Sequence, residues 1–549
     1  MSAIEALRTI RRASPGAGLL KGRCAAGYLR RNAARQRSWL AFCAAVFMCT
    51  ACAASARQPL SAIDWLSQSV SRQGASGGAY GGVNEPPISS GALPGRITVT
   101  SIDGPLMDAL GLLPSSRSGL PYHLWGSASS IELAREIKAE MVETLPSIQA
   151  LLQTLLLAEL APPVDATGRG ELFLARIDKL LDLGALDQAL ALMELVEQPQ
   201  AEVFRRWFDA ALLIGQEDRA CTRMLATPEI APTFPARIFC LARSGDWNAA
   251  ALSLRTGEAL GYIEADMAEL LARFLDPELF EGEPDLPLPA RPSPLVFRLM
   301  EAIGQPLQTT TLPLAFAQAD LRSNAGWKAR IEAGERLART GVIGENQLFG
   351  LYTERKAAAS GGVWERVKAV QELEKALAAG DPGQVAPAIQ AAWQMMTAVE
   401  LEVPFANRYA SSLDDLPLQG PAADLSFRIG LLSDAYEDVA ETRRALDSDE
   451  DFLIGVARGR IIGQTPPDQL GLAIKLAFTG GTLQSPEAAR FLDQGRIGEA
   501  VLLAIHDITE GARGDLRRVT GGLQTLRRVG LETTARRAAL ELLLLERRG

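Results

Sequence analysis

Apolar residues between about Ser129 and the end of the chain recur at helical spacing. Leu172, Phe173, Ile177 and Leu180 follow one another so that all four fall on one helix face. Alternation with a period of two, which is typical of half-buried strands, is nearly absent after Thr100. The sequence therefore predicts an all-α fold. The same helical spacing recurs later at Val367, Val370, Leu373 and Leu377.

The breaks between these predicted helices share a glycine that is followed five positions later by an alanine. Glycine accepts the left-handed backbone conformation that ends a helix, and the small alanine lets the next helix pack closely. The first three glycines are 31 and 30 residues apart and the last two are 35 apart, which is the spacing of a two-helix repeat. The pairs are Gly184 and Ala189, Gly215 and Ala220, Gly245 and Ala250, Gly495 and Ala500, and Gly530 and Ala535.

These units resemble tetratricopeptide-like repeats, in which a glycine-containing turn ends the first helix and a small residue lies near the start of the second. The resemblance implies a helix–turn–helix solenoid with irregular repeats. It departs from the family because the Trp, Tyr and terminal Pro signatures are not kept together in any unit, and because residues 295–480 lose the period. The layout also resembles uncharacterised exported helical proteins of Gram-negative bacteria, a resemblance that implies no function.

A proline-rich stretch, residues 277–294, divides the predicted helices into two arrays. It contains six prolines, and proline in a helix interior removes a hydrogen bond and clashes with the preceding turn. We expect an extended linker between an N-terminal array (129–276) and a C-terminal array (295–549). Residues 96–128 are expected to form an irregular segment that begins with a short strand at 96–100.

Residues 57–95 are rich in Gly, Ser and Pro, which predicts a disordered tether. One short amphipathic helix is expected inside it. This helix has two interpretations: a docking segment for a partner, or a segment that covers the protein's own core, which we favour. Its apolar positions are Leu60, Ile63, Trp65, Leu66 and Val70.

Residues 1–56 have the features of a signal peptide with a basic extension. A basic region precedes the uncharged run 40–54, and Ala54-Ser55-Ala56 fits the small-x-small cleavage pattern. The run is shorter than the roughly 20 residues that span a membrane, so cleavage after Ala56 is favoured over a retained anchor. We predict a periplasmic protein with no membrane span after cleavage. Lipoprotein processing at Cys52 is the alternative.

Charge narrows the choice of partners. The full chain has a formal net charge of −9, and residues 1–56 hold nine basic residues and one acidic residue, so the chain from residue 57 is near −17. Such a surface repels phosphate backbones and anionic headgroups. We therefore predict protein partners and no nucleic acid.

Cys221 and Cys240 are the two cysteines that follow residue 56. The turn between their predicted helices centres near Ala231, which places both cysteines at similar height in an antiparallel pair. A disulfide and two buried free thiols are equally compatible with this placement.

Sequence motifs for catalysis or cofactor binding are not found. His123 has no Cys, Asp or Glu at ligand spacing. Asp447, Asp449 and Asp451 resemble the start of a calcium loop, but Phe452 stands where that loop requires glycine. The chain has no nucleophile elbow, Walker loop, dinucleotide fingerprint or HExxH. We predict no catalytic residue, no metal and no cofactor.

Three functional hypotheses follow. The first is a non-catalytic periplasmic scaffold or accessory factor of the cell envelope that binds proteins through its helical surface. The alternative is a peptidoglycan- or glycan-processing enzyme that uses an unrecognised carboxylate, for which acid pairs such as Asp414-Asp415 are candidates. This enzyme requires a pocket that holds a carboxyl group with a raised pKa. The third is a structural spacer held by an uncleaved N-terminus.

Overall fold

A computed structural model describes residues 106–197, 200–481 and 483–545. The predicted signal peptide, tether, short amphipathic helix and strand at 96–100 lie outside the described residues. No helix within the described ranges has the length and apolar character needed to cross a membrane.

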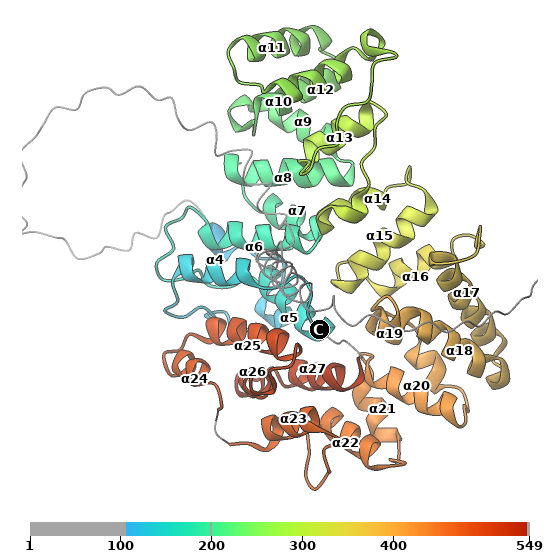
Figure 1. The fold of residues 1–549 in the computed structure, drawn as a ribbon. Coiled ribbons are helices and arrows are strands. Elements are labelled where there is room, and N and C mark those ends of the chain that lie inside the picture. The colour runs from blue at the N-terminus through green and yellow to red at the C-terminus, as the bar shows by residue number, and fades with distance from the viewer. Residues whose placement is uncertain (1–105, 198–199, 482, 546–549) are drawn as a thin grey trace, which may run out of the picture. The chain divides into compact units, whose positions relative to one another are not determined.

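The described residues fold as α-helices and short 3-10 helices, without a β-strand among them (Figure 1). The all-α prediction is confirmed. The elements up to the proline-rich stretch are η1 (Met107–Ala109), α3 (Ser115–Ser118), α4 (Ser130–Ala139), α5 (Pro146–Leu157), α6 (Glu171–Asp182), α7 (Leu186–Glu194), α8 (Ala201–Ile214), α9 (Glu217–Ala226), η2 (Pro228–Ile230), α10 (Phe234–Arg243), α11 (Trp247–Ala259), α12 (Ala265–Leu275) and η3 (Pro277–Phe280).

The later elements continue the helical pattern to the end of the described chain. They are α13 (Pro294–Ala302), η4 (Thr309–Thr311), η5 (Leu314–Phe316), α14 (Ala317–Asp320), α15 (Trp327–Arg339), α16 (Glu345–Thr353), α17 (Val363–Ala379), α18 (Pro382–Thr397), α19 (Glu402–Asp414), α20 (Pro421–Leu431), α21 (Tyr436–Thr442), α22 (Ser448–Ala457), α23 (Gln469–Thr479), α24 (Pro486–Asp493), α25 (Ile497–Gly511), α26 (Leu516–Arg528) and α27 (Glu532–Leu544).

The five glycine–alanine pairs occupy equivalent places in five helix–turn–helix units. Each glycine lies between two helices with φ between 70° and 88°, the left-handed region that glycine tolerates best. Each alanine is the fourth residue of the following helix and is fully buried. Local turn chemistry therefore sets the spacing of these units, whereas their membership of the tetratricopeptide class stays a prediction.

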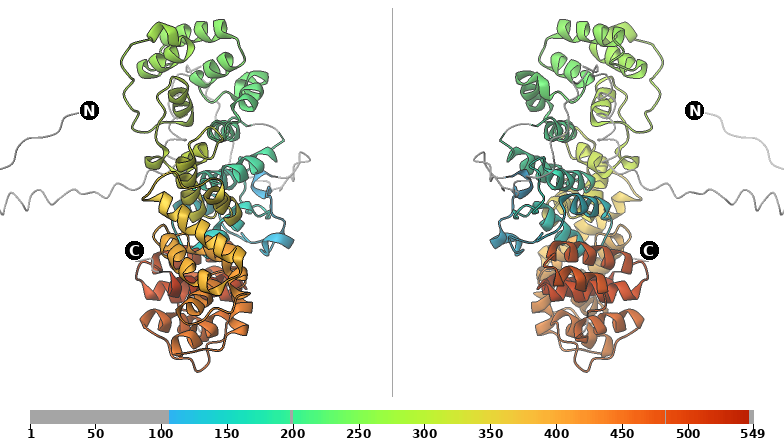
Figure 2. Two further views of the ribbon diagram at one scale, coloured as in Figure 1. Left: turned by 90° about the vertical axis from the view of Figure 1, so that its right-hand side faces the viewer. Right: turned by 90° about the vertical axis from the view of Figure 1, so that its left-hand side faces the viewer.

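Helices α4 and α5 contact helices from the other end of the described chain (Figures 1 and 2). Helix α27 packs on α5, and α25 packs on α4 and α5. The Ser147 N–H and hydroxyl donate to the Glu541 carboxylate at 3.0 and 2.7 Å, and the Thr144 and Thr509 hydroxyls are 2.6 Å apart. An open solenoid has contacts only between neighbouring repeats, so these end-to-end contacts distinguish the chain from such an array.

Contacts also cross the proline-rich stretch 277–294. Helix α13 packs on α8, and Gln318 of α14 donates to the Gly184 carbonyl at 2.7 Å. The stretch is not extended throughout, because η3 occupies its start and Pro294 begins α13. Proline is accepted in a first helical turn because no hydrogen bond is lost there. The helices before and after the stretch therefore share one packed surface between α8 and α13.

Candidate binding pocket

A cavity of about 420 Å³ opens between α8, the start of α10, the turn before α12 and the start of α13. We call it the α8–α10 pocket. Most of its lining side chains are apolar, and polar groups reach it from α8 and from the helix starts. The apolar lining residues are Phe208, Pro232, Pro235, Ala236, Tyr262, Ile263, Met267 and Leu295, and the others are Arg205, Asp209, Thr233, Gly261, Glu264 and Ser293.

Capped helix starts fix the wall of this pocket. The Thr233 hydroxyl accepts from the Ala236 N–H at 3.2 Å, and the Ser293 hydroxyl accepts from the Val296 N–H at 3.2 Å. Both hydroxyls are used to satisfy backbone donors at the first turn of their helices. They therefore hold α10 and α13 in place and are engaged before any ligand arrives.

Asp209 supplies a buried carboxyl group to the pocket from α8. Its side chain is 9% exposed, and burial raises the pKa of this carboxyl to about 7, against the weaker lowering effect of Arg205 and Arg206. Within the described part of the chain, no hydrogen bond or ion pair reaches the carboxylate. A buried polar group without a partner is rare in folded proteins and requires an explanation.

The two arginines nearest to Asp209 are engaged elsewhere. Arg205 lies one turn earlier on α8 and binds Glu202 at 3.0 Å. Arg206 binds Glu202 at 2.9 Å and also the buried carboxylate of Asp178. Their charges lie close enough to Asp209 to act on it, but their hydrogen bonds go to other carboxylates.

A second carboxyl group, Glu264, lines the same pocket from the residue that precedes α12. Glu264 is exposed, so it lies in a more polar setting than Asp209. The pocket thus joins one buried and one solvated carboxyl group from two different elements.

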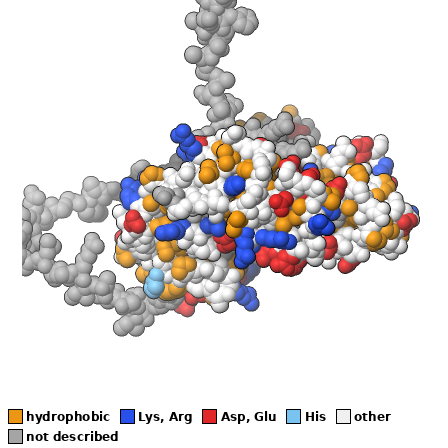
Figure 3. All heavy atoms as spheres, turned by 90° about the horizontal axis from the view of Figure 1, so that it is seen from below, with side chains coloured by type: hydrophobic (Ala, Val, Ile, Leu, Met, Phe, Trp, Pro, Cys, Tyr) orange, Lys and Arg blue, Asp and Glu red, His pale blue; other side chains and the backbone are white. Residues whose placement is uncertain are grey.

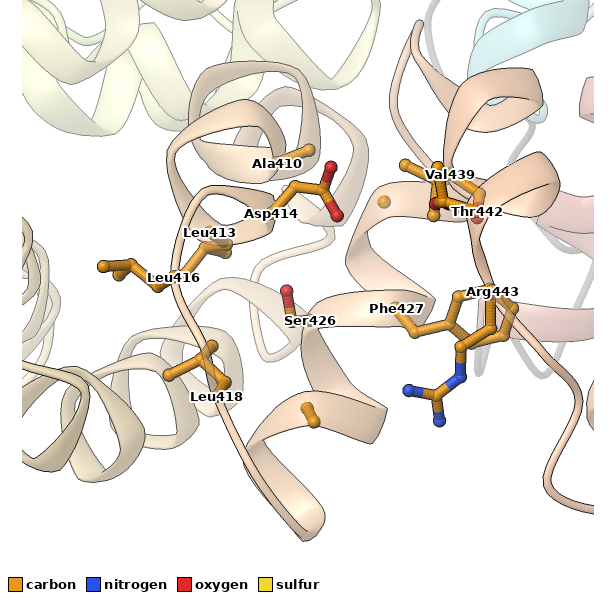
Figure 4. A pocket seen from close by; sticks show the side chains of 12 residues that line it. Ala410, Leu413, Asp414, Leu416, Leu418, Ser426, Phe427, Val439, Thr442 and Arg443 are labelled. Atoms are coloured by element: carbon orange, nitrogen blue, oxygen red, sulfur yellow. Dashed lines mark hydrogen bonds between the residues drawn. The ribbon is translucent and has the colours of Figure 1, made fainter.

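A smaller cavity of about 230 Å³ lies between α19, α20 and α21 (Figure 4). Asp414 is its one lining carboxyl group, and the neighbouring Asp415 is not among its lining residues. Arg443 donates to Glu450 at 2.8 Å and to Asp424 at 2.9 Å, and these bonds hold its pKa above the usual value. Glycoside hydrolysis needs two carboxyl groups across the substrate, so the Asp414-Asp415 pair does not form such a site here.

Cys221 and Cys240 are bonded in the structure, with Cα atoms 4.8 Å apart. The disulfide joins α9 to α10, and both cysteines are buried. Of the two states that the sequence leaves open, a disulfide and two free thiols, the structure contains the disulfide. Because α10 also contributes residues to the α8–α10 pocket, the bond anchors one of its walls.

The residues considered for metal chemistry lie apart from both cavities. His123 is exposed and contacts the Tyr122 ring edge-on at 5.1 Å between centroids. Asp447 caps α22 by accepting from the backbone N–H groups of Asp449 and Glu450. Among the residues that the structure describes, no group of three His, Cys, Asp or Glu side chains is arranged to hold a metal ion.

The arginines of the last helices take part in ion pairs. Arg527 binds Glu532 at 2.8 Å, Arg536 binds Glu437 at 2.9 Å and Arg537 binds Asp434 at 2.7 Å. The face of the molecule seen from below Figure 1 shows Lys and Arg side chains interspersed with Asp and Glu (Figure 3). These pairs offset the positive charge of the three arginines.

The α8–α10 pocket was not predicted from the sequence, although one signal for it exists. Helix α8 is buried along its whole length between Val203 and Leu213, yet this stretch carries Arg205, Arg206 and Asp209 among its apolar residues. A charged residue inside a wholly buried helix indicates a partner or a site. Comparisons with protein-family models, with curated proteins and with solved structures found no match.

Proposed function

We propose that this chain is a non-catalytic scaffold of the cell envelope that binds another protein by a segment seated in the α8–α10 pocket. The observation that carries the proposal is the composition of this pocket, which has mostly apolar walls and opens beside exposed apolar side chains. Tyr262 lines it and is 61% exposed, and Leu260 at the same turn is also exposed. Apolar pockets with few polar groups are the usual form of a binding site.

The surroundings of the pocket support a protein ligand over a small free molecule. Trp247 and Leu252 on α11 are further large apolar side chains exposed to solvent in this part of the chain. Exposed aromatic and aliphatic side chains are enriched where proteins bind one another. These side chains add exposed apolar surface on the helix that precedes Tyr262 in the chain.

The proposed location outside the cytoplasm rests on the sequence of residues 1–56 and on the cysteine pair. A basic region, an uncharged run and a small-x-small site are typical of a secretory signal. Disulfides persist in oxidising compartments such as the periplasm. Mass spectrometry of the intact protein from a native host tests both, since it reports the N-terminal residue and the state of the cysteines.

Site-specific photo-crosslinking tests the binding proposal. A photoreactive phenylalanine analogue replaces Tyr262 in one variant and Ile462, which is 81% exposed and lies between α22 and α23, in a matched control. We expect a discrete adduct with an envelope protein from position 262 and not from position 462. The same adducts from both positions, or none from 262, would refute the proposal.

A second candidate function has its own supporting observation. Asp209 and Glu264 line one pocket, and burial raises the pKa of Asp209 to about 7. Glycosidases use two carboxyl groups that flank the substrate, one as the acid and one as the base or nucleophile, and the acid has a raised pKa. This pair keeps the alternative of a peptidoglycan-processing enzyme open.

Turnover separates the two candidates. Purified peptidoglycan is incubated with the wild-type protein and with Asp209→Asn, and soluble muropeptides are measured. Release by the wild type together with a loss of at least about a hundredfold in the variant would replace the scaffold proposal by the enzymatic one. Equal background release from both proteins supports the scaffold.

A further inference from the structure

We infer that the segment bound in the α8–α10 pocket places a Lys or Arg side chain against Asp209. The inference rests on the proposed function, since it specifies the chemistry of the same bound segment. It is argued from the charges that the pocket presents and from the walls that surround them.

The polar group left without a partner inside the pocket is a carboxyl group, which can take a negative charge. Asp209 is 9% exposed and receives no hydrogen bond or ion pair from a described residue. Arg205 is the cationic side chain of the lining, and it is bound to Glu202 at 3.0 Å. Glu264 adds a second acidic group toward solvent. An anionic ligand would meet both carboxyl groups, whereas a cationic group would gain a partner that Asp209 lacks.

The walls suit the long side chain of a basic residue. Phe208, Tyr262 and Met267 line the same pocket as Asp209 and supply two aromatic rings and a thioether. The methylene stem of Lys or Arg can lie along such a surface while its charged end reaches a carboxylate. Aromatic faces also attract the cation itself. The pocket therefore fits a basic side chain flanked by apolar residues better than a free, fully hydrated cation.

Three capped tripeptides test the inference on the full mature chain. They are acetyl-Leu-Lys-Phe-amide, the same peptide with norleucine in place of lysine, and the same peptide with glutamate. Binding to the wild type, to Asp209→Asn and to the control Asp266→Asn is measured by ligand-observed NMR titration. Asp266 is exposed on α12 and does not line the pocket, and circular dichroism checks that all three proteins are folded.

We expect the lysine peptide to bind the wild type about tenfold or more tightly than the norleucine peptide. This preference should disappear in Asp209→Asn and remain in Asp266→Asn, with the glutamate peptide weakest. Equal affinity for the lysine and norleucine peptides would overturn the basic-residue inference and leave an apolar binding segment in place. Binding of no peptide would also overturn the inference, while the crosslinking at Tyr262 decides the proposed function independently.

Discussion

Two buried carboxylates at opposite parts of the chain have contrasting surroundings. Glu541 on α27 is 2% exposed and accepts the backbone N–H and the hydroxyl of Ser147. Asp209 on α8 is 9% exposed and accepts no hydrogen bond from a described residue. A satisfied buried carboxylate stabilises a packed interface, and an unsatisfied one costs free energy that a ligand can recover. The hydrogen-bond partners of a buried acid, more than its burial, thus separate a structural role from a binding role.

The largest effect is expected from Glu541→Ala. The substitution leaves the Ser147 N–H buried without an acceptor and removes bonds between α5 and α27. We expect a loss of about 4 kcal/mol in the free energy of unfolding, measured by chemical denaturation. Ser147→Ala removes the hydroxyl alone and should cost about 1 kcal/mol. A loss below about 1 kcal/mol for Glu541→Ala would show that the hydrogen bonds of Glu541 do not give it the structural role that separates it from Asp209.

The disulfide stabilises the pocket side of the molecule covalently. Cys221 and Cys240 are separated by 19 positions, and releasing a loop of this size costs about 3 kcal/mol in the chain-entropy description. We expect the Cys221→Ala, Cys240→Ala double variant to unfold at lower denaturant concentration than the oxidised protein. With a reducing agent present, the wild type should approach the double variant. An unchanged midpoint on reduction would contradict the stabilising role.

Stability should also depend on pH through Glu140, which ends α4 beside α25. Burial raises the pKa of Glu140 to about 8 from 4.5, Lys179 opposes the shift, and Glu136 and Asp507 add to it. A raised folded-state pKa means that this contribution is complete below about pH 4.5 and is lost as pH rises through 8. We expect a decline of about 3 kcal/mol between pH 5 and pH 8.

Glu140→Gln isolates that contribution from the other ionisable groups. The amide cannot ionise, so the difference in stability between wild type and variant should grow in favour of the variant with rising pH. Glu143→Gln is the control, because Glu143 is exposed and follows α4 in the chain. Parallel stability curves for wild type and Glu140→Gln would show that Glu140 is ionised in the folded protein at neutral pH.

The smallest effect is expected from Asp209→Asn. Because burial raises the pKa of Asp209 to about 7 from 3.8, its stabilising contribution is lost as pH rises from about 4 through 7. The variant should equal the wild type near pH 4 and should gain about 2 kcal/mol relative to it between pH 5 and pH 8. Thermal melts at both pH values measure this difference. A clear destabilisation at pH 8 would show that Asp209 has a structural role and would remove the contrast with Glu541.

Local rules in the sequence predict much of the helical framework. Gly215 and Ala220 show why: a left-handed residue ends one helix, and a small buried residue follows four positions into the next. Neither requirement depends on distant parts of the chain. The hydrogen bond between Ser147 and Glu541 spans 394 positions. The helical periodicity of the sequence cannot predict such a long-range contact.

The pocket was less accessible to prediction than the helices. The pocket is formed by α8 and α13 together, and these helices lie on opposite sides of the proline-rich stretch in the sequence. Its composition therefore depends on tertiary packing. The charged residues Arg205, Arg206 and Asp209 among the apolar residues of α8 were the local signal. The spacing of Cys221 and Cys240 around a turn predicted that the two cysteines lie at the same level of two antiparallel helices. It could not predict whether they form a disulfide, because bonded and free cysteines pack in similar places.

The packing of α27 on α5 has a consequence for the order in which the protein folds. A linear repeat array can fold progressively from any unit and needs polar end units to stop further stacking. Here α5 is covered by α27 only after α27 has been synthesised, so this part of the core cannot form while the preceding helices are still being made. The contact also covers the faces of α5 and α27 that, in an open repeat array, would be free to stack on a further unit. Loss of α27 alone would therefore both stall completion of the fold and create an aggregation-prone end.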